Sequence, residues 1–152
     1  MARLVKKPGD VFKMALSDTQ HGYAQWLPDE TARVFSAALD RDLTIDEIAG
    51  LPVAFRVLVF KDTPNKYGWV KVGNSPVPSE CANPQHYSKQ DPITGAISIY
   101  FEGHERTATY KQAAALEVCA IWAHPHIVER LNSVIGGSES SFLNSIKLKP
   151  NA

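Results

Sequence analysis

Two runs of alternating side chains near the start of the chain constrain the fold more than any other feature. The first run, residues 11–16, places three apolar side chains on one side of an extended chain: Phe12, Met14 and Leu16. Residues 23–27 alternate in the same way, and this period of two is typical of a strand with one buried face. The polar segment 17–22 between them ends in glycine, as longer hairpin connections often do. Residues 7–27 therefore predict a β-hairpin, which needs further strands because two strands alone are marginally stable.

The next segments predict one more strand and a short helix. Residues 32–39 suit a helix by their alanines and a strand by Val34-Phe35, and we favour a strand because the neighbouring segments are strands. Thr44 and Glu47 have the spacing of a capping box, in which each side chain bonds the backbone N–H of the other residue. A helix should therefore occupy residues 45–49 and end at Gly50.

Residues 53–60 form the most β-prone run of the chain and are apolar on both faces apart from Arg56. This pattern predicts a central strand that is covered on both sides. Residues 67–73 alternate again and should pair with that strand as a second hairpin. Residues 74–94 hold four prolines and predict a long loop of the kind that is often functional. Residues 96–102 predict a further strand.

The period changes in the last third of the chain. Residues 110–124 are rich in alanine and leucine and predict an amphipathic helix packed on the sheet. Pro125 should end or kink it, and residues 126–135 predict a second helix closed by Gly136-Gly137. Residues 138–152 predict a polar tail, in which three apolar side chains could dock a final turn: Phe142, Leu143 and Ile146.

The composition is that of an ordinary soluble globular protein and disfavours several functions. The 152 residues favour a single domain, residues 1–152. Sixteen basic and sixteen acidic residues give zero net charge, so a general affinity for nucleic acid or an anionic membrane is not expected. The N-terminus lacks the apolar region of a signal peptide and no apolar run reaches membrane-spanning length, which favours a cytoplasmic protein. Cys81 and Cys119 lack the spacing of a zinc site, and Cys119 is expected to be a small core residue.

The charges are nevertheless unevenly distributed. Between residues 29 and 47 there are two bases, Arg33 and Arg41, and six acids: Asp29, Glu30, Asp40, Asp42, Asp46 and Glu47. Such a cluster is usually a solvated surface, and it becomes informative only if a basic partner exists.

Histidines offer the main enzymatic alternative. His124 and His126 flank Pro125, and His104-Glu105 could add ligands to a metal or nuclease-like site. We favour a structural role for the pair at the end of a helix, where the helix dipole favours them, because no third and fourth ligand has a suitable spacing. Residues 138–141 are expected to be solvated tail, and no phosphate loop, GxSxG or HExxH pattern occurs. No cofactor and no enzymatic activity are therefore predicted.

Three aromatic residues could form either a binding platform or part of the core: Trp26, Tyr67 and Trp69. We favour the core for each of them, because strand aromatics most often close a sheet.

Four segments in series resemble the immunity protein 26 family of bacterial polymorphic-toxin systems, whether contact-dependent or type VI secretion systems. They are GDVFKMAL at residues 9–16, GYAQWL at 22–27, LTIDEIAGLPVAFRVLV at 43–59 and YGWVKVGNSPVP at 67–78. The resemblance covers residues 9–78 in the expected order. The chain departs from the pattern at residues 32–39, where a more aromatic strand is expected, and the C-terminal half carries no motif of the family.

The resemblance implies a non-enzymatic cytoplasmic protein that neutralises a cognate toxin domain by occluding its active site or another surface that it needs. Combined with the acidic segment and the strand aromatics, it suggests these toxin-binding residues: Asp29, Glu30, Asp40, Asp42, Asp46, Trp26 and Tyr67. The alternative is a small SH3-like barrel that binds nucleic acid or a peptide through its aromatics. The sequence leaves the toxin and the oligomeric state open.

The fold class predicted from these observations is α+β. A bent antiparallel sheet of five to six strands, or an SH3-like partial barrel, would be packed against two C-terminal helices. The expected organisation is a β-rich part at residues 9–78, a helical part at 109–136 and a tail at 138–152.

Overall fold

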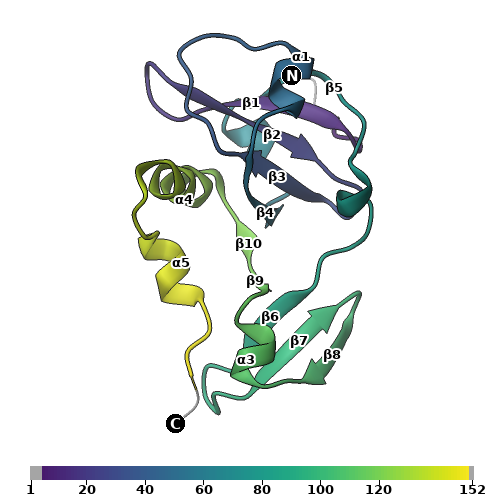
Figure 1. The fold of residues 1–152 in the computed structure, drawn as a ribbon, viewed down its shortest axis with the longest axis vertical. Helices are drawn as coiled ribbons and strands as arrows, with labels where there is room; N and C mark the ends of the chain where they lie inside the picture. Colours follow the sequence, from purple (N-terminus) through teal and green to yellow (C-terminus); the bar gives the residue numbers. More distant parts are fainter. Residues whose placement is uncertain (1–4, 151–152) are drawn as a thin grey trace.

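A computed structural model describes residues 5–150 and confirms the α+β class. Within these residues, ten strands form two sheets, accompanied by five α-helices and a short 3-10 helix. The two sheets lie at opposite ends of the long axis of the molecule, and the last two helices run along one side between them (Figure 1). The single-domain organisation stays a prediction.

The main sheet has six strands in the order β10-β4-β3-β2-β1-β5. The strands are β1 (Asp10–Ala15), β2 (His21–Trp26), β3 (Thr31–Phe35), β4 (Val53–Val59), β5 (Val70–Asn74) and β10 (Ile121–Trp122). The predicted hairpin is confirmed, because β1 and β2 pair antiparallel from Val11 opposite Gln25 to Ala15 opposite His21. The predicted strand at 32–39 is confirmed only as far as Phe35, and Leu39 makes an isolated bridge to His21.

Two predictions about β4 and β5 are wrong. β5 pairs with β1 and not with β4, because the helix α2 (Thr63–Lys66) carries the chain away from β4 before β5 begins. β4 is not covered on both faces: Phe55, Val57 and Val59 are buried, whereas the first residue of the strand is exposed and the intervening side chains are half-buried. Only the last two residues of β4 pair with β10, so most of β4 has a single neighbouring strand.

The predicted helix is confirmed as α1 (Ile45–Ala49). Thr44 accepts a hydrogen bond from the Glu47 N–H at 3.2 Å, and the Glu47 carboxylate accepts one from the Thr44 N–H at 3.0 Å. Gly50 ends the helix as expected. The Ile48 side chain is buried against the sheet, so the helix covers one of its faces.

The second sheet was not expected from the sequence. Its order is β8-β7-β6-β9, built from β6 (Tyr87–Gln90), β7 (Ile97–Phe101), β8 (His104–Thr107) and β9 (Glu117–Val118). The predicted strand at 96–102 is confirmed as β7. The long loop predicted at 74–94 is interrupted by the 3-10 helix η1 (Ser79–Cys81) and by β6.

The helix predicted at 110–124 is wrong. Apart from His124, which begins the next helix, only α3 (Tyr110–Ala113) is helical, and the chain then adds β9 in parallel to β6 and β10 in parallel to β4. Backbone hydrogen bonds at two sheet edges, together with complete burial of Trp122, outweigh the helical propensity of this alanine-rich segment.

The last two helices are α4 (His124–Gly136) and α5 (Ser141–Ile146). α4 begins two residues before the predicted helix, with Pro125 in its first turn, and it ends at Gly137 with a left-handed φ of 70°. The final turn predicted in the tail is confirmed, since α5 packs Phe142, Leu143 and Ile146 against the main core. None of the helices in residues 5–150 has the length and apolar character needed to cross a membrane.

The main sheet separates two apolar cores. One face carries the larger core, which α4 and β10 complete with Trp122, Ile127 and Leu131. The opposite face carries a smaller core under α1, made of Val11, Tyr23, Phe35 and Ile48. Beyond this smaller core, towards β5, the same face is left open.

Candidate functional site

A groove of about 620 Å³ lies on this open part of the main sheet. Its floor is formed by alternate residues of three neighbouring strands, and its walls are the β1–β2 turn and the loop after β3. The lining side chains used below are Lys13, Asp18, Tyr23, Asp42, Leu43, Val70 and Val72. The floor carries Val70 and Val72 beside Tyr23, His21 and Lys13, so the groove combines a partly apolar floor with charged groups, as protein-binding surfaces usually do.

The buried Tyr23 hydroxyl fixes the wall formed by the loop after β3. It accepts a hydrogen bond from the Leu43 N–H at 3.1 Å and lies 3.1 Å from His21 Nε2. Leu39 is also bonded to His21 through both backbone groups, at 2.8 and 2.9 Å. These contacts hold the loop against β2, so the groove is shaped before any partner binds.

An exposed ion pair crosses the groove. Lys13 Nζ lies 2.6 Å from Asp42 Oδ1, and this hydrogen bond raises the pKa of Lys13 and lowers the pKa of Asp42. Because both groups are in contact with water, the pair adds little to stability. A partner that enters the groove would meet Lys13 and Asp42 as a pair and not as two free charges.

The border of the groove is acidic. Five acids lie on the groove wall, on the adjoining loop or on α1: Asp18, Asp40, Asp42, Asp46 and Glu47. Two bases, Lys13 and Arg41, lie among them, so the net charge of this border is −3. The backbone N–H of Thr44 lowers the pKa of Glu47, so its carboxylate stays ionised. A basic surface would be attracted to this border.

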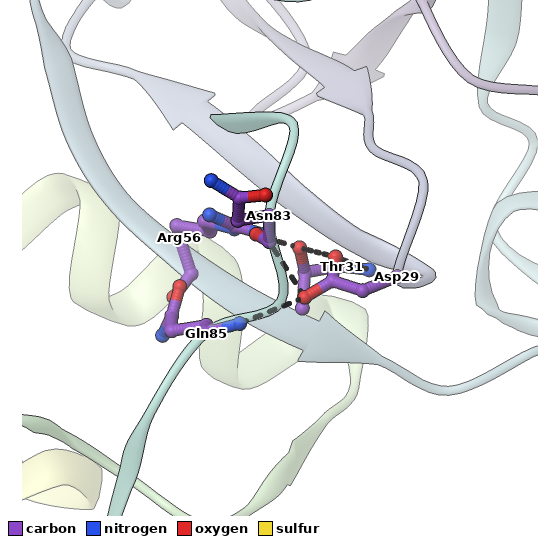
Figure 2. Close-up of polar contacts among 5 residues, drawn as sticks. All are labelled: Asp29, Thr31, Arg56, Asn83 and Gln85. Atoms are coloured by element: carbon purple, nitrogen blue, oxygen red, sulfur yellow. Dashed lines mark hydrogen bonds and ion pairs between the residues drawn. The ribbon is translucent and has the colours of Figure 1, made fainter. Parts of the chain in front are cut away.

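A second polar cluster lies at the opposite end of β2 and β3, and Figure 2 shows its members converging there. Arg56 on β4 donates to Asp29 Oδ2, to Thr31 Oγ1 and to the Asn83 carbonyl, each at 2.9 Å. Gln85 donates two further hydrogen bonds, from its backbone N–H to Asp29 Oδ2 at 3.3 Å and from its side-chain amide to the Arg56 carbonyl at 3.1 Å. The cluster thus ties the main sheet to the segment that leads into the second sheet.

The ionisation of Asp29 follows from these contacts. Burial by itself raises the pKa of this carboxyl, but the hydrogen bond from Thr31 and the charge of Arg56 outweigh it, and the pKa lies below its usual value. Asp29 is therefore an ionised carboxylate that is already paired inside the molecule.

Comparison with protein families matches residues 7–96 to a family described as Immunity protein 26. The match spans more than half of the chain and includes the groove and the Asp29–Arg56 cluster. This chain belongs to the immunity protein 26 family. Comparison with curated proteins and with solved structures found no significant match. Membership of the family implies an immunity protein that acts against a toxin.

The structure of this immunity protein divides the predicted toxin-binding residues into two groups. Asp42 lines the groove, Asp40 lies on the adjoining loop and Asp46 lies on α1, and all three are exposed. Asp29 and Glu30 lie in the turn between β2 and β3, at the other end of those strands. These acids are close in the sequence, but the strand β3 lies between the two groups and carries the chain from one end of the sheet to the other. A toxin contact through either group stays a prediction.

The aromatic residues belong mainly to the core of the immunity protein. Trp26 is only 5% exposed and packs edge-on against Phe12, and Trp69 is equally buried, which confirms the core interpretation for both. Tyr67 is half-buried and stacks on His124 with ring centres 4.8 Å apart. A direct contact of Trp26 or Tyr67 with a toxin stays a prediction.

The histidines have structural partners. His124 Nδ1 accepts a hydrogen bond from Trp69 Nε1 at 3.0 Å, and His126 stacks on Phe142 with ring centres 3.7 Å apart. Both lie at the start of α4 and not at the end of a helix, so the helix-dipole reason given for them is wrong. Within residues 5–150, no three His, Cys, Asp or Glu side chains are grouped so that they could hold a metal ion.

One feature of the groove was missed in the sequence. Val70 and Val72 were assigned to a strand by their alternation, but the same alternation fits a strand with partners on both sides. That β5 is the last strand of the sheet depends on its pairing with β1, which lies more than fifty residues earlier in the chain.

Proposed function

We propose that this immunity protein binds a cognate toxin domain through the groove and its acidic border, and neutralises it by occlusion. The observation that carries the proposal is the family match over the residues that build the groove. The groove supports it because its walls are held by hydrogen bonds before binding, which lowers the cost of ordering on association.

The charge of the border suggests the chemistry of the toxin surface. Three excess negative charges around a partly apolar floor fit a partner with a basic surface, such as the substrate cleft of a nuclease. Covering such a cleft would block the toxin without any reaction by the immunity protein. Neutralisation would take place in the cytoplasm of the cell that produces the toxin.

The proposal is tested in two steps. The tagged chain is used to capture its partner from the source cells, and the captured toxin domain is then produced in susceptible cells with and without the immunity protein. Restored growth in the presence of the chain is the expected result. Growth arrest that the chain does not relieve would contradict the proposed function.

The acidic border is tested by charge reversal. Converting Asp40, Asp42 and Asp46 to lysine should weaken toxin binding at low salt by about tenfold or more, mainly through slower association. The control reverses three exposed acids outside the groove: Glu80, Glu102 and Glu139. Equal affinity of the two triple variants would show that the groove border is not the toxin-binding surface.

A further inference from the structure

The outer edge of β5 is open. β5 ends the main sheet, and β1 is its strand partner in the part of the chain between residues 5 and 150. One row of its backbone N–H and C=O groups therefore points away from the sheet. Such a row is a template for another extended chain, and natural proteins usually protect it.

The protection usually provided by charges is weak at β5. Its one charged residue, Lys71, lies 2.9 Å from a carboxylate oxygen of the buried Asp10, so its charge is already paired within the sheet. In contrast, β8 at the edge of the second sheet carries three polar or charged residues in a row, His104, Glu105 and Arg106, although Glu105 is itself paired with Lys89. Of these two edges, β5 is the one that can accept a further strand.

The groove adjoins this edge and adds side-chain contacts to it. Val70 and Val72 are 56% and 38% exposed and line the groove together with Leu43. A strand placed beside β5 would project alternate side chains over these two valines. Every second residue of such a strand would then face the groove, and an apolar side chain at these positions would be removed from water.

Charge decides which strand is suited to the site. Pairing β5 with β5 of a second copy would bring two acidic borders onto one face of a continuous sheet, where they repel each other. A strand that carries lysine or arginine would instead place a positive charge near Asp18 on the groove wall, and it would compete with Lys13 for Asp42.

We propose that an extended segment of the toxin, with apolar and basic side chains, adds to β5 as a further strand of the main sheet. This inference rests on the proposed function, because it names the part of the toxin that the groove receives. Backbone hydrogen bonds to β5 would hold the segment, while Val70, Val72 and Asp18 would select its side chains.

The test uses the purified full chain and a displayed library of random peptides of about eight residues, which is within the usual range of strand lengths. We expect selection of peptides that alternate apolar residues with lysine or arginine. Their affinity should fall by about tenfold or more in the Val70→Lys/Val72→Lys variant. It should not change in the control variant Val134→Lys/Ile135→Lys, which alters two exposed apolar residues of α4.

Backbone methylation separates strand addition from simple groove binding. Methylating the N–H groups of one alternate set of residues in the selected peptide should abolish binding, whereas methylating the other set should not, because only one set faces β5. No enriched peptide, equal loss in both double variants, or self-association of the chain through β5 would each overturn the inference. If the Val70→Lys/Val72→Lys variant still protects cells from the toxin, strand addition fails while the immunity function stands.

Discussion

Two tryptophans of the main core differ in the surroundings of a single nitrogen. Trp69 Nε1 donates to His124, whereas Trp122 Nε1 is buried without a hydrogen-bond partner among residues 5–150. Arg130 lies over the Trp122 ring at 4.9 Å, and Phe142 meets it edge-on. Trp122 is therefore held by contacts to its ring and not by a hydrogen bond from its indole nitrogen.

Replacing each tryptophan by phenylalanine separates these contributions. Both changes remove the same atoms from a buried site, but Trp69→Phe also leaves His124 Nδ1 without its donor. We expect Trp69→Phe to lower the free energy of unfolding by about 1 kcal/mol more than Trp122→Phe. Urea unfolding of the two variants measures this difference, and a larger loss for Trp122→Phe would contradict it.

His124 makes the core sensitive to pH. Burial lowers its pKa below 6.5, and the hydrogen bond with the Ala15 backbone only partly opposes this effect. The unfolded chain therefore binds a proton in a pH range where folded His124 stays neutral. The contribution of His124 to stability is complete above the unfolded pKa and declines as the pH falls below 6.5.

The substitution His124→Asn tests this dependence, because asparagine keeps an oxygen near the position of Nδ1 but cannot titrate. The free energy of unfolding of the natural chain should fall more steeply than that of the variant between about pH 7 and pH 5. Parallel curves for the two proteins would exclude a titrating role for His124.

At the level of the elements, the Asp29–Arg56 cluster joins β3 and β4 to the segment before β6. The substitution Arg56→Met would leave the Asp29 carboxylate largely buried without its guanidinium partner, at a cost of about 2–4 kcal/mol in the free energy of unfolding. The control Arg106→Met changes an exposed arginine of β8 and should cost about 0.5 kcal/mol or less.

The double variant Asp29→Asn/Arg56→Met provides a further check. Removing the charge of Asp29 should recover part of the stability lost in Arg56→Met, because the unpaired carboxylate is then absent. A double variant less stable than Arg56→Met would show that the ion pair is not the source of the loss.

Elements with strong local signals were predictable from the sequence. The β1–β2 hairpin and α1 depend on alternation and on the capping residues Thr44 and Glu47, all of which are close in the chain. β9 and β10 were not predictable, because two-residue strands have no measurable period and form only where β6 and β4 offer an edge. The strand partner of β5 was predicted wrongly for the same reason, because its pairing with β1 is decided by contacts between distant parts of the chain.

At the level of the whole molecule, the candidate site was only partly predictable. The acidic composition of residues 29–47 pointed to a charged surface, and Asp40, Asp42 and Asp46 do lie on one. The distance along the chain could not reveal that β2 and β3 carry Asp29 to the opposite end of the sheet. Nor could composition reveal that Asp29 is already paired with Arg56.

The family match ends at residue 96, but the main core continues beyond it. Trp122, Ile127 and Leu131 cover the face of the sheet that carries Phe12 and Phe55. A fragment of residues 7–96 should therefore expose this face and fail to unfold cooperatively. Thermal unfolding compared with the full chain measures this, and a sharp transition of the fragment would contradict it.

The cover formed by β10, α4 and α5 also bears on how such proteins can diverge. Packing against the sheet requires apolar side chains of suitable volume, but it does not require particular residues. A segment that only has to supply apolar side chains of suitable volume can have nearly all of its residues substituted and still cover the same core. A boundary of sequence similarity, such as residue 96, can therefore fall inside a unit that folds as a whole.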